Sequence, residues 1–142
     1  MNLMFLAVAA GVLALIFAFV LTSRINKQDA GTERMKEIAG SIAEGARAFL
    51  FAEYKILVIF AVVFFVVLCV IRNVPTALCF IVGALFSTIA GYCGMNVATK
   101  ANVRTAAAAK DSGMAKALSV AFSGGAVMGM CVVGLGLTGV GA

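Results

Sequence analysis

Four long apolar stretches dominate the pattern of hydrophobic and polar positions along the chain. A helix crosses a bilayer with about 20 apolar residues, and three of the stretches reach that length. The second is shorter, but the apolar residues 49–51 lengthen it on its N-terminal side. The pattern predicts an all-α, polytopic membrane protein with four transmembrane helices. The predicted spans are residues 1–21, 52–72, 76–99 and 117–140 of a single membrane segment, 1–142.

The second span is predicted to be the end of a much longer helix. Thr32 is a residue type that caps helix N-termini, and apolar residues such as Met35 and Ile42 then recur at helical spacing. No helix breaker follows before Ile71, so we expect one helix of roughly 60 Å, from Thr32 to about Ile71. Its first half would stand in the cytoplasm or lie along the membrane surface. The sequence of residues 73–75, Asn-Val-Pro, predicts a tight turn that makes the second and third spans an antiparallel hairpin.

Composition and charge support this class and add an orientation. The chain is 63% hydrophobic and 12% charged, with a mean hydropathy of +1.12, which is typical of an integral membrane protein. Ten of the eleven Lys and Arg residues lie in 22–55 and 100–116, and only Arg72 lies in the other connection. By the positive-inside rule, 22–51 and 100–116 are expected to be cytoplasmic and both termini outside. The expected location is a bacterial plasma membrane. The net charge of +5 therefore reflects topology, and no nucleic-acid partner is expected.

Small residues recur every four positions in the third and fourth spans. Such rows let helix backbones approach closely, which is how membrane helices associate. The third and fourth helices are therefore expected to pack tightly on each other or on another partner. The predicted packing positions are Gly83, Ser87, Gly91, Gly94, Ala121, Gly125 and Gly129.

A polar cluster at the end of the third span is the main candidate for function. One interpretation is that its residues end the helix and hold a short cytoplasmic loop. The other is a docking or phosphate-proximal loop of a larger protein, in which the planar guanidinium of Arg104 would bind a carboxylate or phosphate. The cluster consists of Asn96, Thr99, Asn102, Arg104 and Thr105.

The sequence predicts no catalytic, cofactor-binding or metal-binding residue in this segment. The six acidic residues are spread along solvated positions, and no predicted span holds the carboxylate that an ion carrier needs at membrane depth. Residues 134–139 fit the pattern G-x-G-x-x-G, but the nucleotide fingerprint requires a preceding strand. A membrane span predicts helix packing there instead.

Three strings in the chain resemble one family. Residues 91–107 (GYCGMNVATKANVRTAA), 117–129 (ALSVAFSGGAVMG) and 39–54 (AGSIAEGARAFLFAEY) are similar to the N-terminal region of membrane-bound, ion-translocating inorganic pyrophosphatases. The resemblance implies a multi-span homo-oligomeric pump, with helices in two rings, that couples Mg²⁺-dependent pyrophosphate hydrolysis to export of H⁺ or Na⁺. The last residues are an apolar, Gly-rich run, which is expected of a truncated chain.

The resemblance implies a structural role for this segment. It would supply outer helices that contact the bilayer and the remaining helices of the parent pump, and it would be inactive as an enzyme when isolated. The Mg²⁺ of the family would be bound elsewhere, with no cofactor in this segment. The alternative is a self-associating small membrane scaffold or a channel-like protein.

Overall fold

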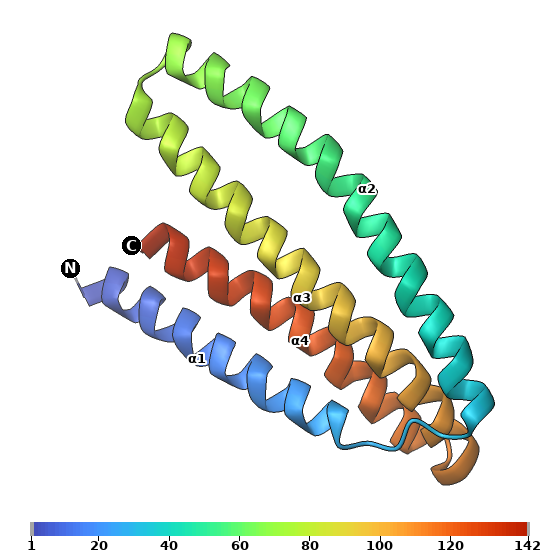
Figure 1. Cartoon of the computed structure of the whole chain (residues 1–142). Coiled ribbons are helices and arrows are strands. Elements are labelled where there is room, and N and C mark those ends of the chain that lie inside the picture. The colour runs from blue at the N-terminus through green and yellow to red at the C-terminus, as the bar shows by residue number, and fades with distance from the viewer. Residues whose placement is uncertain (1, 142) are drawn as a thin grey trace.

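The computed structural model describes residues 2–141, with side chains from Met4 onward, so that residues 1 and 142 of the predicted segment lie outside the description. All four helices are long and apolar enough to cross a membrane, and the described residues form no strand. The prediction of an all-α protein with four candidate transmembrane helices is confirmed. The helices are α1 (Asn2–Asn26), α2 (Glu33–Ile71), α3 (Val74–Ser112) and α4 (Met114–Gly141) (Figure 1).

The helices lie side by side in the order α2, α3, α4, α1, which differs from their order in the chain (Figure 1). α3 packs extensively on α4, α4 on α1, and α2 packs only on α3. The two termini and the α2–α3 turn lie at one end of the bundle (Figure 1). The other end carries the α1–α2 and α3–α4 connections, where most of the basic residues are found.

The structure confirms the predicted long helix α2. The Thr32 hydroxyl accepts a hydrogen bond from the Met35 amide at 3.4 Å, which is the expected N-cap. The Lys36 ammonium donates to the Glu33 carboxylate at 2.8 Å, and this hydrogen bond and the carboxylate charge raise the pKa of Lys36. The 39 residues of α2 extend over roughly 58 Å, about twice the hydrocarbon thickness of a bilayer. Only Leu50 of this helix is buried, so its apolar surface is left for lipid or for other helices.

The predicted tight turn before α3 is also confirmed. Asn73 caps the helix, because its side-chain oxygen accepts from the Thr76 amide at 3.1 Å and from the Thr76 hydroxyl at 2.6 Å. Pro75 lies in the first turn, where its missing amide hydrogen costs nothing. The hairpin of α2 and α3 therefore follows from local capping chemistry.

The expectation that the polar cluster ends the third helix is wrong. α3 continues through the cluster to Ser112. The run Ala106–Ala109 has the highest helix propensity of any residue type, so nothing local stops the helix there. The break comes at Gly113, whose φ of 85° lies in the left-handed region that favours glycine. α3 and α4 are thus joined by a single residue.

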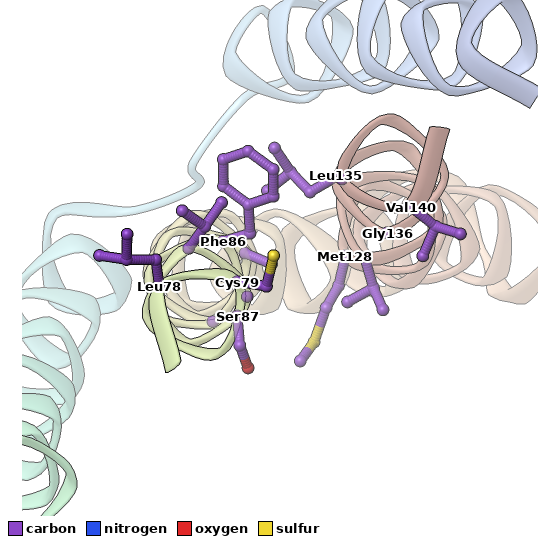
Figure 2. Close-up of a pocket in the computed structure, with 14 residues that line it drawn as sticks. Leu78, Cys79, Phe86, Ser87, Met128, Leu135, Gly136 and Val140 are labelled. Carbon is purple, nitrogen blue, oxygen red and sulfur yellow. The ribbon is translucent and has the colours of Figure 1, made fainter. Parts of the chain in front are cut away.

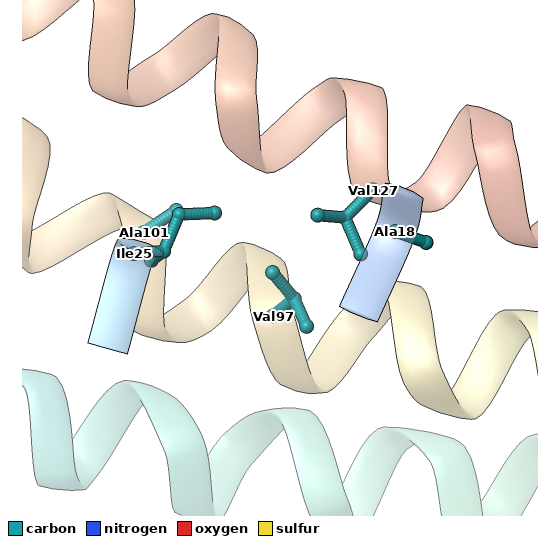
Figure 3. Close-up of a cluster of buried hydrophobic side chains, with 5 residues drawn as sticks. All are labelled: Ala18, Ile25, Val97, Ala101 and Val127. Atoms are coloured by element: carbon teal, nitrogen blue, oxygen red, sulfur yellow. The ribbon is translucent and has the colours of Figure 1, made fainter. Parts of the chain in front are cut away.

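Small buried side chains form the core of the bundle (Figure 3). α1 contributes Ala18 and Ile25, α3 contributes Val97 and Ala101, and α4 contributes Val127. Three helices meet around this cluster because side chains of this size let their axes come close. α2 contributes nothing to the cluster.

Candidate functional site

Arg104, the residue singled out in the sequence, links α3 to the end of α1. Its Nε donates to the carbonyl of Gln28 at 3.1 Å and its Nη2 to the carbonyl of Asn26 at 3.5 Å. Its Nη1 donates to the carbonyl of Lys100, one turn back on α3, at 2.9 Å. Two of its donors are therefore directed at backbone carbonyls around the start of the α1–α2 connection, and the third at a carbonyl of its own helix.

This arrangement completes the C-terminus of α1. The last carbonyls of a helix have no partner inside the helix, and a cation there also interacts favourably with the negative end of the helix dipole. Arg104, on the neighbouring helix α3, provides the missing hydrogen-bond donors and the positive charge. The guanidinium is half-buried, so water screens the charge only in part. We call this contact the Arg104 clamp.

The α1–α2 connection rests on the same part of α3. The amide of Gly31 donates to the Asp29 carboxylate at 3.0 Å, which closes a local turn. Gly31 has a φ of 78°, and a Cβ built on it would lie 3.1 Å from the Cβ of Ala107 on α3. Ala107 is buried. The clamp and this close approach together fix the connection against α3.

The other members of the predicted polar cluster are not gathered around Arg104. The hydroxyls of Thr99 and Thr105 donate to carbonyls of their own helix, at 3.1 Å and 2.9 Å, which satisfies them locally. Thr99, Thr105 and Asn102 line a groove of about 460 Å³ between α3 and α4. Asn96 is exposed. The cluster is thus divided between the clamp and the groove.

The predicted packing positions fall into two groups. Gly94 lies at the α3–α4 contact, where an added Cβ would be 2.7 Å from Cγ of Met128. By contrast, Gly83, Gly125 and Gly129 have no atom within 4 Å of an added Cβ. Ala121 and Gly125 line the 460 Å³ groove. Gly83, Ser87 and Gly91 line a second groove of about 840 Å³, also between α3 and α4 (Figure 2).

A close backbone crossing of α1 and α4 was not predicted from the sequence. A Cβ on Gly11 of α1 would lie 2.8 Å from the carbonyl oxygen of Gly134 on α4, so the two backbones touch. Ala14 and Ala18, one and two turns further along α1, are buried. This row of small residues is the signal in the sequence for the crossing.

A hydrogen bond that the sequence did not indicate joins α2 to α3. The Tyr54 hydroxyl donates to the carbonyl of Thr88 at 3.1 Å. Gly91 lies beside it, and an added Cβ there would be 4.0 Å from the tyrosine oxygen. The glycine therefore leaves room for the tyrosine to reach the α3 backbone.

The residues present do not fit a magnesium site. Mg²⁺ is held by carboxylates and substrate phosphates, and among the residues with described side chains no three His, Cys, Asp or Glu residues come together. Glu33 and Glu37 are paired with Lys36 and Arg34 instead. The G-x-G-x-x-G pattern lies inside α4, where Gly134 and Gly139 pack against Leu15 and Phe86. It is a helix-packing segment, as predicted.

Comparison with known proteins identifies the family of this four-helix segment. Residues 12–142 match the family model described as inorganic H⁺ pyrophosphatase. The chain belongs to this family. It is 63% identical over 124 residues to a putative K⁺-stimulated pyrophosphate-energized sodium pump of Clostridium tetani, which covers 87% of this chain and 18% of the relative.

Two proton pumps are also similar to this member of the inorganic pyrophosphatase family. A K⁺-insensitive pyrophosphate-energized proton pump 2 of Moorella thermoacetica is 47% identical over 133 residues, 93% of this chain and 19% of the relative. A K⁺-insensitive pyrophosphate-energized proton pump of Methanosarcina mazei is 42% identical over 140 residues, 97% of this chain and 21% of the relative. The chain spans about one fifth of the length of these relatives.

Proposed function

We propose that this chain forms the N-terminal outer helices of a pump that couples Mg²⁺-dependent pyrophosphate hydrolysis to export of H⁺ or Na⁺. In this proposal the segment supports the pump and does not hydrolyse pyrophosphate by itself. The Arg104 clamp is the observation that carries it. The arginine of the family-like string 91–107 directs three donors at backbone carbonyls, which is the chemistry of a structural anchor.

The distribution of acidic residues supports the same division of labour. Phosphoryl transfer depends on metal ions and positioned cations that neutralise the spreading charge. The Mg²⁺ that the family resemblance implies is proposed to bind to parts of the pump outside this segment, because the described acidic side chains do not converge. The substrate is proposed to bind there as well.

The outward-facing small residues are proposed to contact the remaining helices of the pump. Gly83, Ser87 and Gly91 line the larger groove, and Gly125 and Gly129 leave open space beside α4. Helices that lack bulky side chains admit a neighbouring helix at short distance. A homo-oligomeric pump is proposed on the family resemblance.

The membrane orientation is a further part of the proposal. We place the spans at about 1–21, 52–72, 76–99 and 117–140 of a bacterial plasma membrane, with both termini outside. The basic residues at the end of the bundle that carries the α1–α2 and α3–α4 connections support a cytoplasmic position for 22–51 and 100–116.

A chimera tests the proposal. The matched region of the Clostridium tetani pump is replaced by this chain, and Mg²⁺-dependent release of phosphate from pyrophosphate is measured in membranes. We expect the chimera to hydrolyse pyrophosphate and the isolated 142-residue chain to release none. The same chimera with Arg104→Gln should yield less folded pump, with activity per folded molecule retained. Hydrolysis by the isolated chain, or loss of activity per folded molecule in the Arg104→Gln chimera, contradicts a supporting role.

Self-association is the second candidate function, and the open groove between α3 and α4 favours it. A second copy of the chain would place a helix against Gly83 and Ser87. Crosslinking in mild detergent checks this: dimers that are lost in a Gly83→Leu variant support self-association, and monomers alone exclude it. The matched control is Leu85→Val, which changes an exposed side chain of the same helix outside the groove.

A further inference from the structure

A small polar pocket of about 210 Å³ lies between the end of α1 and the start of α4. Its rim carries two cations, Arg24 from the last turn of α1 and Lys116 from the first turn of α4. Ser119, one turn further along α4, and Gln28 from the α1–α2 connection add polar side chains. The end of α1 with the connection that follows it, and the start of α4, are distant in the sequence and place polar residues around one pocket.

Arg24 and Lys116 form no ion pair with any other residue that the structure describes. The two ion pairs formed by the described residues are Arg34–Glu37 and Lys36–Glu33, and neither involves Arg24 or Lys116. None of the residues that line the pocket is acidic. Two cations from different helices repel each other when nothing lies between them, so the pocket as it stands favours an anion.

The start of α4 adds to this preference. A helix N-terminus carries a partial positive charge, which makes an acidic residue favourable and a lysine unfavourable in the first turn. α4 has no acidic residue in its first turn and has Lys116 there. An anion bound between Lys116 and Arg24 would offset both effects.

The position and lining of the pocket narrow the class of anion. Its inner wall is apolar, with Ile25 and Val120 both buried, and it lies where two membrane-spanning helices meet the basic connections. Ser119 and Gln28 supply hydrogen-bond donors in addition to the two charges. Charges and neutral donors over an apolar wall suit a phosphate group, and basic pockets between helices at this level bind lipid headgroups.

We propose that this pocket binds a phosphate group, held by Arg24 and Lys116 with Ser119 and Gln28 as neutral donors. The group belongs to an acidic phospholipid or to free phosphate. The Arg104 clamp contributes indirectly, since it holds the backbone carbonyl of Gln28 at 3.1 Å and so fixes one wall of the pocket. The proposal concerns this segment alone and does not depend on the activity of the pump.

The two sources are distinguished by two measurements on the 142-residue chain in nanodiscs. In the first, nanodiscs of phosphatidylcholine with a minor share of phosphatidylglycerol are used, and the phosphatidylglycerol retained after release into detergent is counted by native mass spectrometry. In the second, nanodiscs of phosphatidylcholine alone are titrated with inorganic phosphate, and thermal unfolding is followed by circular dichroism. Retention of phosphatidylglycerol identifies a lipid, and stabilisation by inorganic phosphate identifies a free anion.

Variants decide whether the pocket is responsible. The double variant Arg24→Gln/Lys116→Gln should bind the identified ligand, phosphatidylglycerol or inorganic phosphate, roughly 10- to 30-fold more weakly. Each cation near the surface contributes a factor on the order of five to the binding affinity. Lys27→Gln with Lys110→Gln removes the same charge from exposed positions outside the pocket and should change it less than about threefold. Lys116→Gln alone changes one exposed side chain, leaves the fold intact and should weaken binding about fivefold.

Absence of both phosphatidylglycerol retention and stabilisation by phosphate in the unmodified chain overturns the proposal. Equal losses in the pocket variant and in the control variant also overturn it, because the effect would then come from net charge. If the pocket double variant loses helix content, Lys116→Gln alone decides, and unchanged binding in that variant rejects the pocket.

Discussion

Replacement of Gly11 by alanine tests the close backbone contact between α1 and α4. A Cβ at this position would lie 2.8 Å from the carbonyl oxygen of Gly134 and 3.1 Å from the amide nitrogen of Thr138. An ordinary contact between carbon and a carbonyl oxygen is about 3.3–3.6 Å. Both of these atoms belong to the α4 backbone and cannot rotate away, so α1 must move from α4 by roughly 0.6 Å, the difference between the two distances.

The expected cost follows from overpacking. Inserting one methyl group into a close-packed contact costs about 1–3 kcal/mol, while alanine in place of glycine within a helix recovers about 0.5–1 kcal/mol. The net destabilisation for Gly11→Ala is therefore about 0–2.5 kcal/mol, centred on about 1 kcal/mol. The free energy of unfolding is measured in mixed micelles of a mild detergent and dodecyl sulfate, with far-ultraviolet circular dichroism as the signal.

Two further glycines on the same scaffold provide controls. Gly129→Ala places its Cβ where no atom lies within 4 Å, so it should be neutral or stabilising by up to about 1 kcal/mol. At Gly94 the three atoms nearest to an added Cβ all belong to the Met128 side chain, the closest at 2.7 Å. The outer atoms of that half-exposed side chain can move by a change of rotamer, so the effect of Gly94→Ala should lie between the other two. If Gly11→Ala and Gly129→Ala have the same unfolding free energy, the backbone contact between α1 and α4 is not as close as described.

Three other substitutions test single contacts. Arg104→Gln removes charged donors from three backbone carbonyls, of which the bond to Gln28 is part-buried, and should cost about 1–2 kcal/mol and speed proteolysis of the α1–α2 connection, whereas Lys110→Gln, an exposed control, should do neither. Tyr54→Phe removes the hydrogen bond to the Thr88 carbonyl and should cost about 0.5–1.5 kcal/mol; unaltered stability and unaltered hydrogen exchange at the α2–α3 contact would contradict the bond. Thr32→Ala removes the α2 cap and should fray its first turn at a cost of about 1 kcal/mol, which amide exchange would report as faster exchange confined to that turn.

Local signals in the sequence predicted the helices well. The Thr32 cap and the unbroken run to Ile71 act over a few residues, and the structure has both. The turn predicted at residues 73–75 lies at Arg72 and Asn73, because Val74 and Pro75 already belong to α3. The extension of α3 to Ser112 does not follow from the polar pattern, because polar side chains by themselves do not end a helix. A cap or a breaker ends a helix, and none occurs before Gly113.

The candidate site was predictable only in part. Arg104 was singled out for its planar, charged side chain, but its partners are backbone carbonyls of residues 26 and 28, more than seventy positions earlier in the chain. Backbone carbonyls leave no signature in a sequence, since every residue has one. The pocket of Arg24 and Lys116 was missed for a related reason, because its two cations lie on helices that are adjacent in space and distant in the chain.

The sequence by itself determined that the protein is an integral membrane protein, where its helices begin and turn, and which family it belongs to. The tertiary structure alone decided which small residues lie between helices: Gly11, Gly94 and Gly134 have neighbours within contact distance, whereas Gly83 and Gly129 face open space. In a soluble protein an apolar stripe marks the buried face of a helix. These spans are apolar on every side, because lipid and helix interiors have similar polarity, so only the fit of one helix against another selects the face that is buried.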